Sequence, residues 1–136
     1  MTTFVGPLVA RPDAGLVLRN LRTGRIVANR LLPAFESQTR RTGLLKHTSL
    51  DDGEAMIIAP TNAVHTWFMK FDIDIAFVAR DGRVLKARDT VRPWRMTGAL
   101  GAFAVIEMKA GSFAAADTVA GDMLEVIEGC RAVSEF

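Results

Sequence analysis

The pair Asp81-Gly82 is the sequence feature that most constrains the fold of this chain. It separates two largely apolar runs, 73–79 and 84–91. Tight hairpin turns prefer these residues, because glycine readily takes the positive φ that such turns need. Two runs joined in this way predict an antiparallel hairpin. The centre of the chain is therefore expected to form antiparallel β-structure.

Further short apolar runs bounded by turn residues bring the predicted number of strands to about eight. The other expected strands cover residues 15–21, 26–31, 55–59, 64–69, 102–109 and 123–127. Short helices are predicted at 33–41, with Pro33 in the first turn and Gly43 after the end, and at 112–117. This pattern predicts a mainly β fold, a β-sandwich or barrel-like domain with one or two short helices.

Length and composition set the broad class of the protein. The 136 residues fit one domain, residues 1–136, with residues 1–13 as a loose N-terminal lead-in. Cys130 is the single cysteine, so an internal disulfide is excluded. No run is long and apolar enough to span a bilayer, and the N-terminus has no basic leader. A cytoplasmic protein is expected, although a leader removed earlier would leave the same chain.

The charge balance argues against a nucleic-acid partner. The net charge is +2, from 17 basic and 15 acidic residues. Basic residues gather early in the chain and acidic residues near its end, an asymmetry that can steer a charged ligand. There is no dense basic run with interleaved aromatic residues, so the charges are expected on solvated faces.

Residues 65–77 place one histidine and two aspartates in the most apolar, aromatic-rich run of the chain: His65, Asp72 and Asp74. Burying an ionisable side chain is costly unless it has a partner. Strand alternation puts Asp74 among apolar neighbours, so it needs donors from backbone N–H groups, His65, Thr66 or an arginine.

Two interpretations of this cluster stay open. His65 and Asp74 could form a general base or an orienting pair in a cleft. Alternatively, a buried hydrogen-bonded network could fix how the strands pack. Thr66 is the only neighbouring hydroxyl, and no nucleophile lies at a useful spacing, so the residues do not decide whether the protein is an enzyme. No metal or cofactor is expected, because paired ligand spacings and glycine-rich phosphate loops are absent from the sequence.

The loop Arg92-Pro93-Trp94-Arg95 is a second candidate site. An exposed tryptophan between two guanidinium groups would form a platform for an anion or a sugar ring. The alternative is a tryptophan packed over a sheet edge with the arginines stacked on it. Trp67, inside the apolar run, is expected in the core, and Glu107 is expected on a solvated face.

Several sequence blocks occur in an order and spacing that resemble one family. They are Arg41-Thr42-Gly43-Leu44, Met56-Ile57-Ile58, residues 65–74, Asp81-Gly82-Arg83-Val84, Pro93-Trp94, residues 105–111 and Gly121-Asp122. From about Gly24 to about Val126 the chain resembles the uncharacterised prokaryotic family called domain of unknown function 192. The resemblance implies a mostly β sandwich-type fold and no activity. Phe68 and Asp72 stand where the family usually has glycine and proline.

Together these patterns predict a small β-sandwich module that binds a small polar ligand, a carbohydrate or another anionic metabolite. The candidate ligand-binding residues are His65, Thr66, Asp72, Asp74, Arg92, Trp94 and Arg95. The alternatives are a hydrolase or isomerase that uses the His65–Asp74 pair, and an interaction or structural protein without a small-molecule site. Neither nucleic acid nor membrane is expected as a partner, and the oligomeric state is left open.

Overall fold

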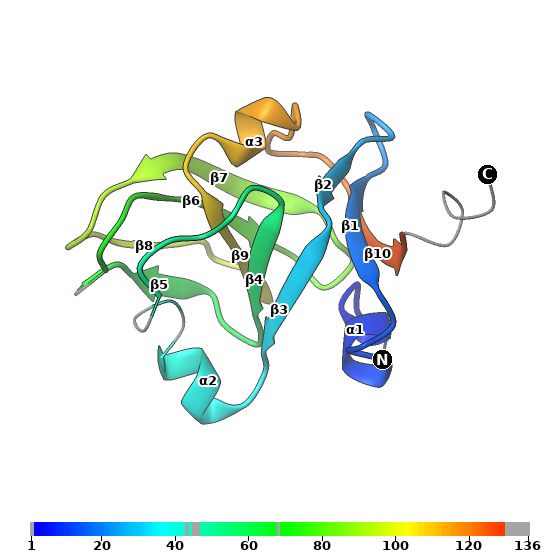
Figure 1. Cartoon of the computed structure of the whole chain (residues 1–136), viewed down its shortest axis with the longest axis horizontal. Coiled ribbons are helices and arrows are strands. Elements are labelled where there is room, and N and C mark those ends of the chain that lie inside the picture. The colour runs from blue at the N-terminus through cyan, green and yellow to red at the C-terminus, as the bar shows by residue number, and fades with distance from the viewer. Residues whose placement is uncertain (1, 43, 45–46, 68, 130–136) are drawn as a thin grey trace.

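The computed structural model describes residues 2–42, 44, 47–67 and 69–129 (Figure 1). Within these residues the chain forms ten strands and three short helices. The predicted mainly β, sandwich-like fold is confirmed. The number of strands exceeds the expectation because the predicted strand 26–31 is divided in two and the three-residue strand Met96–Gly98 was not predicted. The N-terminal helix Gly6–Ala10 was not predicted either.

Five strands form the central sheet. Their order is β3 (Arg30–Ala34), β4 (Glu54–Ile58), β9 (Ala104–Lys109), β6 (Ile73–Val78) and β7 (Val84–Val91). β3 runs parallel to β4, and the other neighbours are antiparallel. The predicted hairpin joins β6 to β7, with Gly82 at φ 100°. A Cβ atom there would lie 2.2 Å from the carbonyl oxygen of Leu124, so space as well as backbone angle requires glycine.

Two smaller sheets complete the β-structure. Three antiparallel strands form the sheet β10 (Leu124–Glu128), β1 (Leu16–Asn20) and β2 (Ile26–Ala28). β5 (Ala63–His65) pairs with β8 (Met96–Gly98) as a two-stranded ribbon. In Figure 1 the three-stranded sheet lies to the right of the central sheet and the ribbon lies to the left.

The two faces of the central sheet pack against different partners, as β6 illustrates. Ile73, Ile75 and Phe77 belong to one buried cluster, whereas Ala76 and Val78 belong to another, which confirms the predicted alternation. The second cluster also contains residues of the three-stranded sheet, among them Leu16, Leu18, Leu124 and Val126. Because each large apolar side chain contributes about 1.5–3 kcal/mol when buried, both faces stabilise the sandwich.

The prediction of a loose N-terminal lead-in is wrong. Residues Gly6–Ala10 form helix α1, and Phe4, Val5 and Leu8 are buried in the core. The backbone N–H of Phe4 also donates to the carbonyl oxygen of Arg80 at 2.8 Å. A few apolar side chains therefore anchor this segment, although they are too few to produce a clear helical period in the sequence.

The segment after β1 also differs from the prediction. The expected antiparallel return at 26–31 is divided between β2 and β3, which belong to different sheets. Pro33 lies in β3 instead of opening a helix, and an edge strand tolerates its missing N–H. Helix α2 therefore begins later, at Ser37–Thr42. The expected helix stop at Gly43 lies outside the described residues, as does Cys130.

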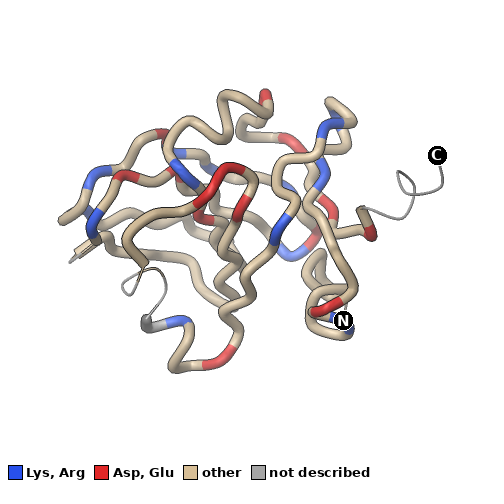
Figure 2. The backbone as a smooth tube through the Cα atoms, in the orientation of Figure 1, with Lys and Arg blue, Asp and Glu red and all other residues tan. Residues whose placement is uncertain are grey.

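The uneven charge along the sequence is balanced in space, because β1 pairs with β10. Arg19 is ion-paired with Glu125, and Arg22 Nε donates to Asp122 Oδ1 at 2.6 Å. Basic and acidic positions alternate around the backbone (Figure 2). The early basic residues and the late acidic residues therefore neutralise one another here instead of forming two opposed faces.

Candidate functional site

Asp74 is a structural residue in the centre of the fold. Its side chain has no exposed surface, as burial in β6 predicted. Oδ1 accepts the backbone N–H of Thr90 at 2.9 Å, and Oδ2 accepts those of Gly111 and Phe113, each at 3.1 Å. Of the donors that the sequence allowed, backbone N–H groups fill the role. They fix β7 and the start of helix α3 (Ser112–Ala115) to β6.

His65 and Asp74 do not form the predicted pair. The expected strand 64–69 is wrong beyond His65, because the observed strand ends there and the chain turns at the next residues. The His65 side chain is exposed, and its ring lies 4.8 Å from the ring of Trp67. Both oxygens of Asp74 accept backbone N–H groups instead. A hydrolase or isomerase mechanism through this pair therefore has no geometric basis.

Thr66 holds two loops together beside His65. Its hydroxyl donates to the carbonyl oxygen of Arg92 at 2.6 Å and accepts the N–H of Arg95 at 2.8 Å. Its own carbonyl oxygen accepts the N–H of Trp94 at 3.0 Å. Thr66 is buried. Thr66, a predicted ligand-binding residue, thus positions the 92–95 loop. Its hydroxyl is already engaged in hydrogen bonds to the backbone of this loop.

Trp94 is exposed and has an unusual backbone conformation. Its side chain is 58% exposed, and its φ is 67°. A bulky residue at positive φ is a genuine outlier that the surrounding hydrogen bonds must maintain. Arg92 and Arg95 are exposed on either side of it. Of the two alternatives that the sequence left open for Trp94, the structure shows the exposed one.

Trp67 lies on the surface, so its predicted place in the core is wrong. The side chain is 40% exposed, because the strand expected to bury it stops two residues earlier. We call the exposed residues at this end of the ribbon the aromatic platform: His65, Trp67, Arg92, Trp94 and Arg95. Asp72 is partly buried, and no hydrogen bond or ion pair joins it to another described residue. The sequence therefore located the platform but not its boundary.

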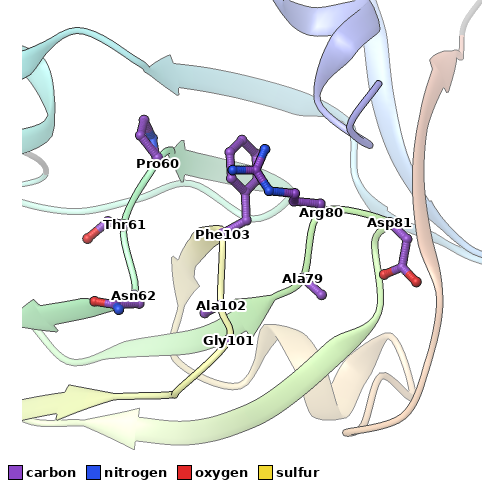
Figure 3. Close-up of a pocket in the computed structure, with 9 residues that line it drawn as sticks. All are labelled: Pro60, Thr61, Asn62, Ala79, Arg80, Asp81, Gly101, Ala102 and Phe103. Carbon is purple, nitrogen blue, oxygen red and sulfur yellow. The ribbon is translucent and has the colours of Figure 1, made fainter. Parts of the chain in front are cut away.

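A hollow of about 670 Å³ lies at the other end of the ribbon, away from the platform (Figure 3). Three connections form its walls: residues 60–62, 79–81 and 101–103. The guanidinium carbon of Arg80 lies 4.6 Å from the centre of the Phe103 ring. None of the predicted site residues lines this hollow, and the sequence carried no motif for it, because its three segments are far apart along the chain.

Glu107 is buried, so its predicted place on a solvated face is wrong. It is 4% exposed and lies on β9 beside Met56 of β4 and Ile75 of β6. Burial raises the pKa of this carboxyl to about 7. Alternation along β9 was predicted correctly, but the face that carries Glu107 also carries Met56 and Ile75, which belong to the same buried cluster as Ile73 and Phe77.

Asp122 belongs to a polar network that the sequence analysis did not identify. Its carboxylate accepts hydrogen bonds from Arg22 Nε at 2.6 Å, Asn20 Nδ2 at 2.8 Å and the Val119 N–H at 2.9 Å. The hydrogen bond from Arg22 is the main cause that lowers the pKa of Asp122 to about 2. The Gly121-Asp122 block thus has a structural role at the start of β10.

Fold and site together define a small mainly β protein of the sandwich type, with an exposed aromatic surface and an open hollow beside Arg80. A family model matches residues 21–126. The chain therefore belongs to the DUF192 family, described as Uncharacterized ACR. This confirms the resemblance seen in the sequence blocks.

Two solved structures share this fold. A Sinorhizobium meliloti protein, for which a role as a transcription regulator has been suggested, matches with a TM-score of 0.71 and 18% identity, over 82% of this chain and 91% of its own. A Novosphingobium aromaticivorans protein of unknown function matches with a TM-score of 0.70 and 25% identity, over 81% of this chain and 82% of its own. No curated protein matches the chain.

Two further observations concern the described residues only. None of their helices is long and apolar enough to cross a bilayer. No group of three or more histidine, cysteine, aspartate or glutamate side chains is arranged among them to hold a metal ion.

Proposed function

We propose that the protein is a binding module and that its aromatic platform binds an acidic carbohydrate. The observation that carries this proposal is Trp94, which is 58% exposed at a φ of 67°. Strained residues persist only where the surrounding structure maintains them, and they gather at binding sites. A backbone that is already ordered around an exposed aromatic residue lowers the conformational entropy that a ligand must overcome on binding.

The rest of the platform supplies complementary chemistry. Indole rings offer apolar faces with a polar edge, which suits the C–H face of a sugar ring. Arg92 and Arg95 flank Trp94, and guanidinium groups bind carboxylates through two parallel hydrogen bonds. Stacking together with carboxylate recognition favours a sugar acid over a neutral sugar.

The two tryptophans make the proposal directly measurable. Trp67 and Trp94 are the only tryptophans of the chain, which has no tyrosine. Intrinsic fluorescence therefore reports on the platform alone. We expect a saturable change when an oligogalacturonide is added at constant ionic strength, with a neutral oligosaccharide of equal length binding at least about tenfold more weakly.

Single substitutions distinguish binding at the aromatic platform from a general electrostatic attraction of the ligand to the protein. W94A and R95Q should each weaken binding by about tenfold or more, whereas R88Q, which changes an exposed arginine of β7, should not. T66V keeps Trp94 but removes the hydroxyl that positions it, so it should also weaken binding. Absence of a saturable signal, or equal losses in R88Q and R95Q, would contradict the proposal. Equal affinity for monomeric galacturonate would favour a small anionic metabolite over a polymer.

A second candidate function is docking of another protein at the same end of the molecule. Met96 is 67% exposed and pairs with His65 at the platform end of the ribbon, where Trp94 is 58% exposed. An exposed apolar group of this kind can mark an interaction surface. Sedimentation across a wide concentration range tests its simplest form, self-association: M96K should abolish any dimer and leave oligogalacturonide binding unchanged.

A further inference from the structure

The hollow beside Arg80 is separate from the aromatic platform and is built from rigid walls. The N–H of Thr61 donates to the carbonyl oxygen of Phe103, and the N–H of Phe103 donates to that of Val78, both at 2.9 Å. The N–H of Ala79 donates to the carbonyl oxygen of Arg83 at 2.9 Å. Backbone hydrogen bonds thus tie the three connections to the end of the central sheet, so the hollow exists before any ligand binds.

Arg80 differs from the ion-paired arginines of the protein. Arg19, Arg22 and Arg30 each form an ion pair with a carboxylate. The guanidinium of Arg80 instead rests on the ring of Phe103, and no carboxylate pairs with it among the described residues. The contact with the Phe103 ring restricts the Arg80 side chain, and the N–H edge of a guanidinium recognises a carboxylate or phosphate oxygen pair.

The other lining residues limit the charge and shape of a ligand. Asp81 also lines the hollow, and its Oδ1 accepts the N–H of Arg83 at 3.0 Å. In Figure 3 its side chain projects away from the Phe103 ring. One positive and one negative side chain disfavour a ligand with several negative charges. Pro60, Ala79 and Ala102 add apolar surface that suits an apolar ligand body.

We propose that this hollow is a second binding site, which takes a small organic acid with one negative charge and an apolar body. Arg80 binds the oxyanion, and the body lies against Phe103 and the apolar wall. The volume of about 670 Å³ is within the range of small-molecule sites. This site does not depend on the aromatic platform, and either can fail without the other.

Benzoate is the probe that tests this proposal, because it combines a single carboxylate with a flat apolar ring. Amide chemical shifts of the ¹⁵N-labelled full chain should change saturably at Thr61, Gly101 and Phe103. Acetate, which lacks the apolar body, and inorganic phosphate should bind at least about tenfold more weakly at the same ionic strength. Equal shifts with all three anions would overturn the proposal.

A pair of variants in one turn identifies the responsible charge. R80Q should weaken benzoate binding by about tenfold or more, since it removes the charged donor. R83Q, three residues further along the same turn and exposed, should change it by less than about twofold. Melting temperatures of both variants show whether they fold. If the folded R80Q binds benzoate as the unmodified protein does, or if R83Q loses as much, Arg80 is not the anion ligand. If R80Q does not fold, F103L provides the same test, because it removes the stacking surface.

Discussion

His65 and Asp74 lie nine positions apart in one apolar stretch, yet they have opposite environments. Asp74 lies within the central sheet and accepts three backbone hydrogen bonds. His65 is exposed at the end of the two-stranded ribbon, with its ring beside that of Trp67. The comparison shows that a polar residue in an apolar run is buried and hydrogen-bonded where the run continues as a strand, and is exposed where a turn interrupts the run.

The largest expected effect is on the buried side of this comparison. D74A leaves three N–H groups without an acceptor, two of them at the start of helix α3, so it should lower the free energy of unfolding by about 4 kcal/mol. Urea denaturation measures the loss. D72A is the matched control, because Asp72 lies two residues earlier without a hydrogen bond to the described residues. Its effect should stay within about 0.5 kcal/mol. Equal losses of stability in D74A and D72A would contradict the structural role of Asp74.

Glu107 sharpens the comparison, since it is buried without the hydrogen bonds that Asp74 has. Its pKa is raised from 4.5 to about 7, so the folded protein holds this proton more tightly than the unfolded chain. Its contribution to stability is therefore fully favourable below pH 4.5 and is lost as pH rises through about 7. At pH 8, E107Q should be more stable than the unmodified protein by about 3 kcal/mol.

The decisive measurement for Glu107 is denaturant unfolding of E107Q and of the unmodified protein at a series of pH values. The stability difference between E107Q and the unmodified protein should be small at pH 4.5 and should grow towards pH 8. A difference that does not change with pH would mean that Glu107 titrates normally in the folded state. A loss of stability in E107Q at all pH values would mean that the carboxylate has a partner.

Asp122 is the opposite case among the buried carboxylates, because Arg22 stabilises its charged form. Its pKa is lowered from 3.8 to about 2, so its contribution is present above pH 3.8 and is lost as pH falls towards 2. D122N should cost about 2 kcal/mol at pH 7, since charge-assisted hydrogen bonds are lost. Thermal unfolding between pH 7 and pH 2 should show the two proteins converging at the acid end. A difference in stability between the two proteins that stays constant with pH would contradict the lowered pKa of Asp122.

The fold was predictable where the signals are local. The β6–β7 hairpin depends on Asp81-Gly82, and the alternation along β6 depends on the side-chain period of a strand. Local patterns do not specify the parallel pairing of β3 with β4 or the pairing of β5 with β8. Those pairings bring together segments whose match is decided by packing of the whole chain.

The candidate site was predictable only in part, for the same reason. The sequence left open whether Trp94 is exposed or packed over a sheet edge, and the structure shows it exposed. The partners of Asp74 are 16, 37 and 39 residues away, so no spacing could assign them. Trp67 was placed in the core because its neighbours are apolar. A turn after His65 overrides that pattern, and hydrophobic periodicity does not register a turn without glycine or proline.

The smallest expected effect concerns the backbone strain at Trp94. The question is which of two variants, W94G or W94A, is the more stable. Glycine takes a positive φ without steric cost, whereas alanine does not. W94G should therefore be more stable than W94A by about 1 kcal/mol, although both lack the indole ring. At most other exposed positions glycine is the less stable of the two. If both variants lose oligogalacturonide binding while W94G is the more stable, the protein maintains a strained backbone in order to present the ring. If W94A is the more stable, the positive φ is not maintained in solution, and the main support for the platform disappears.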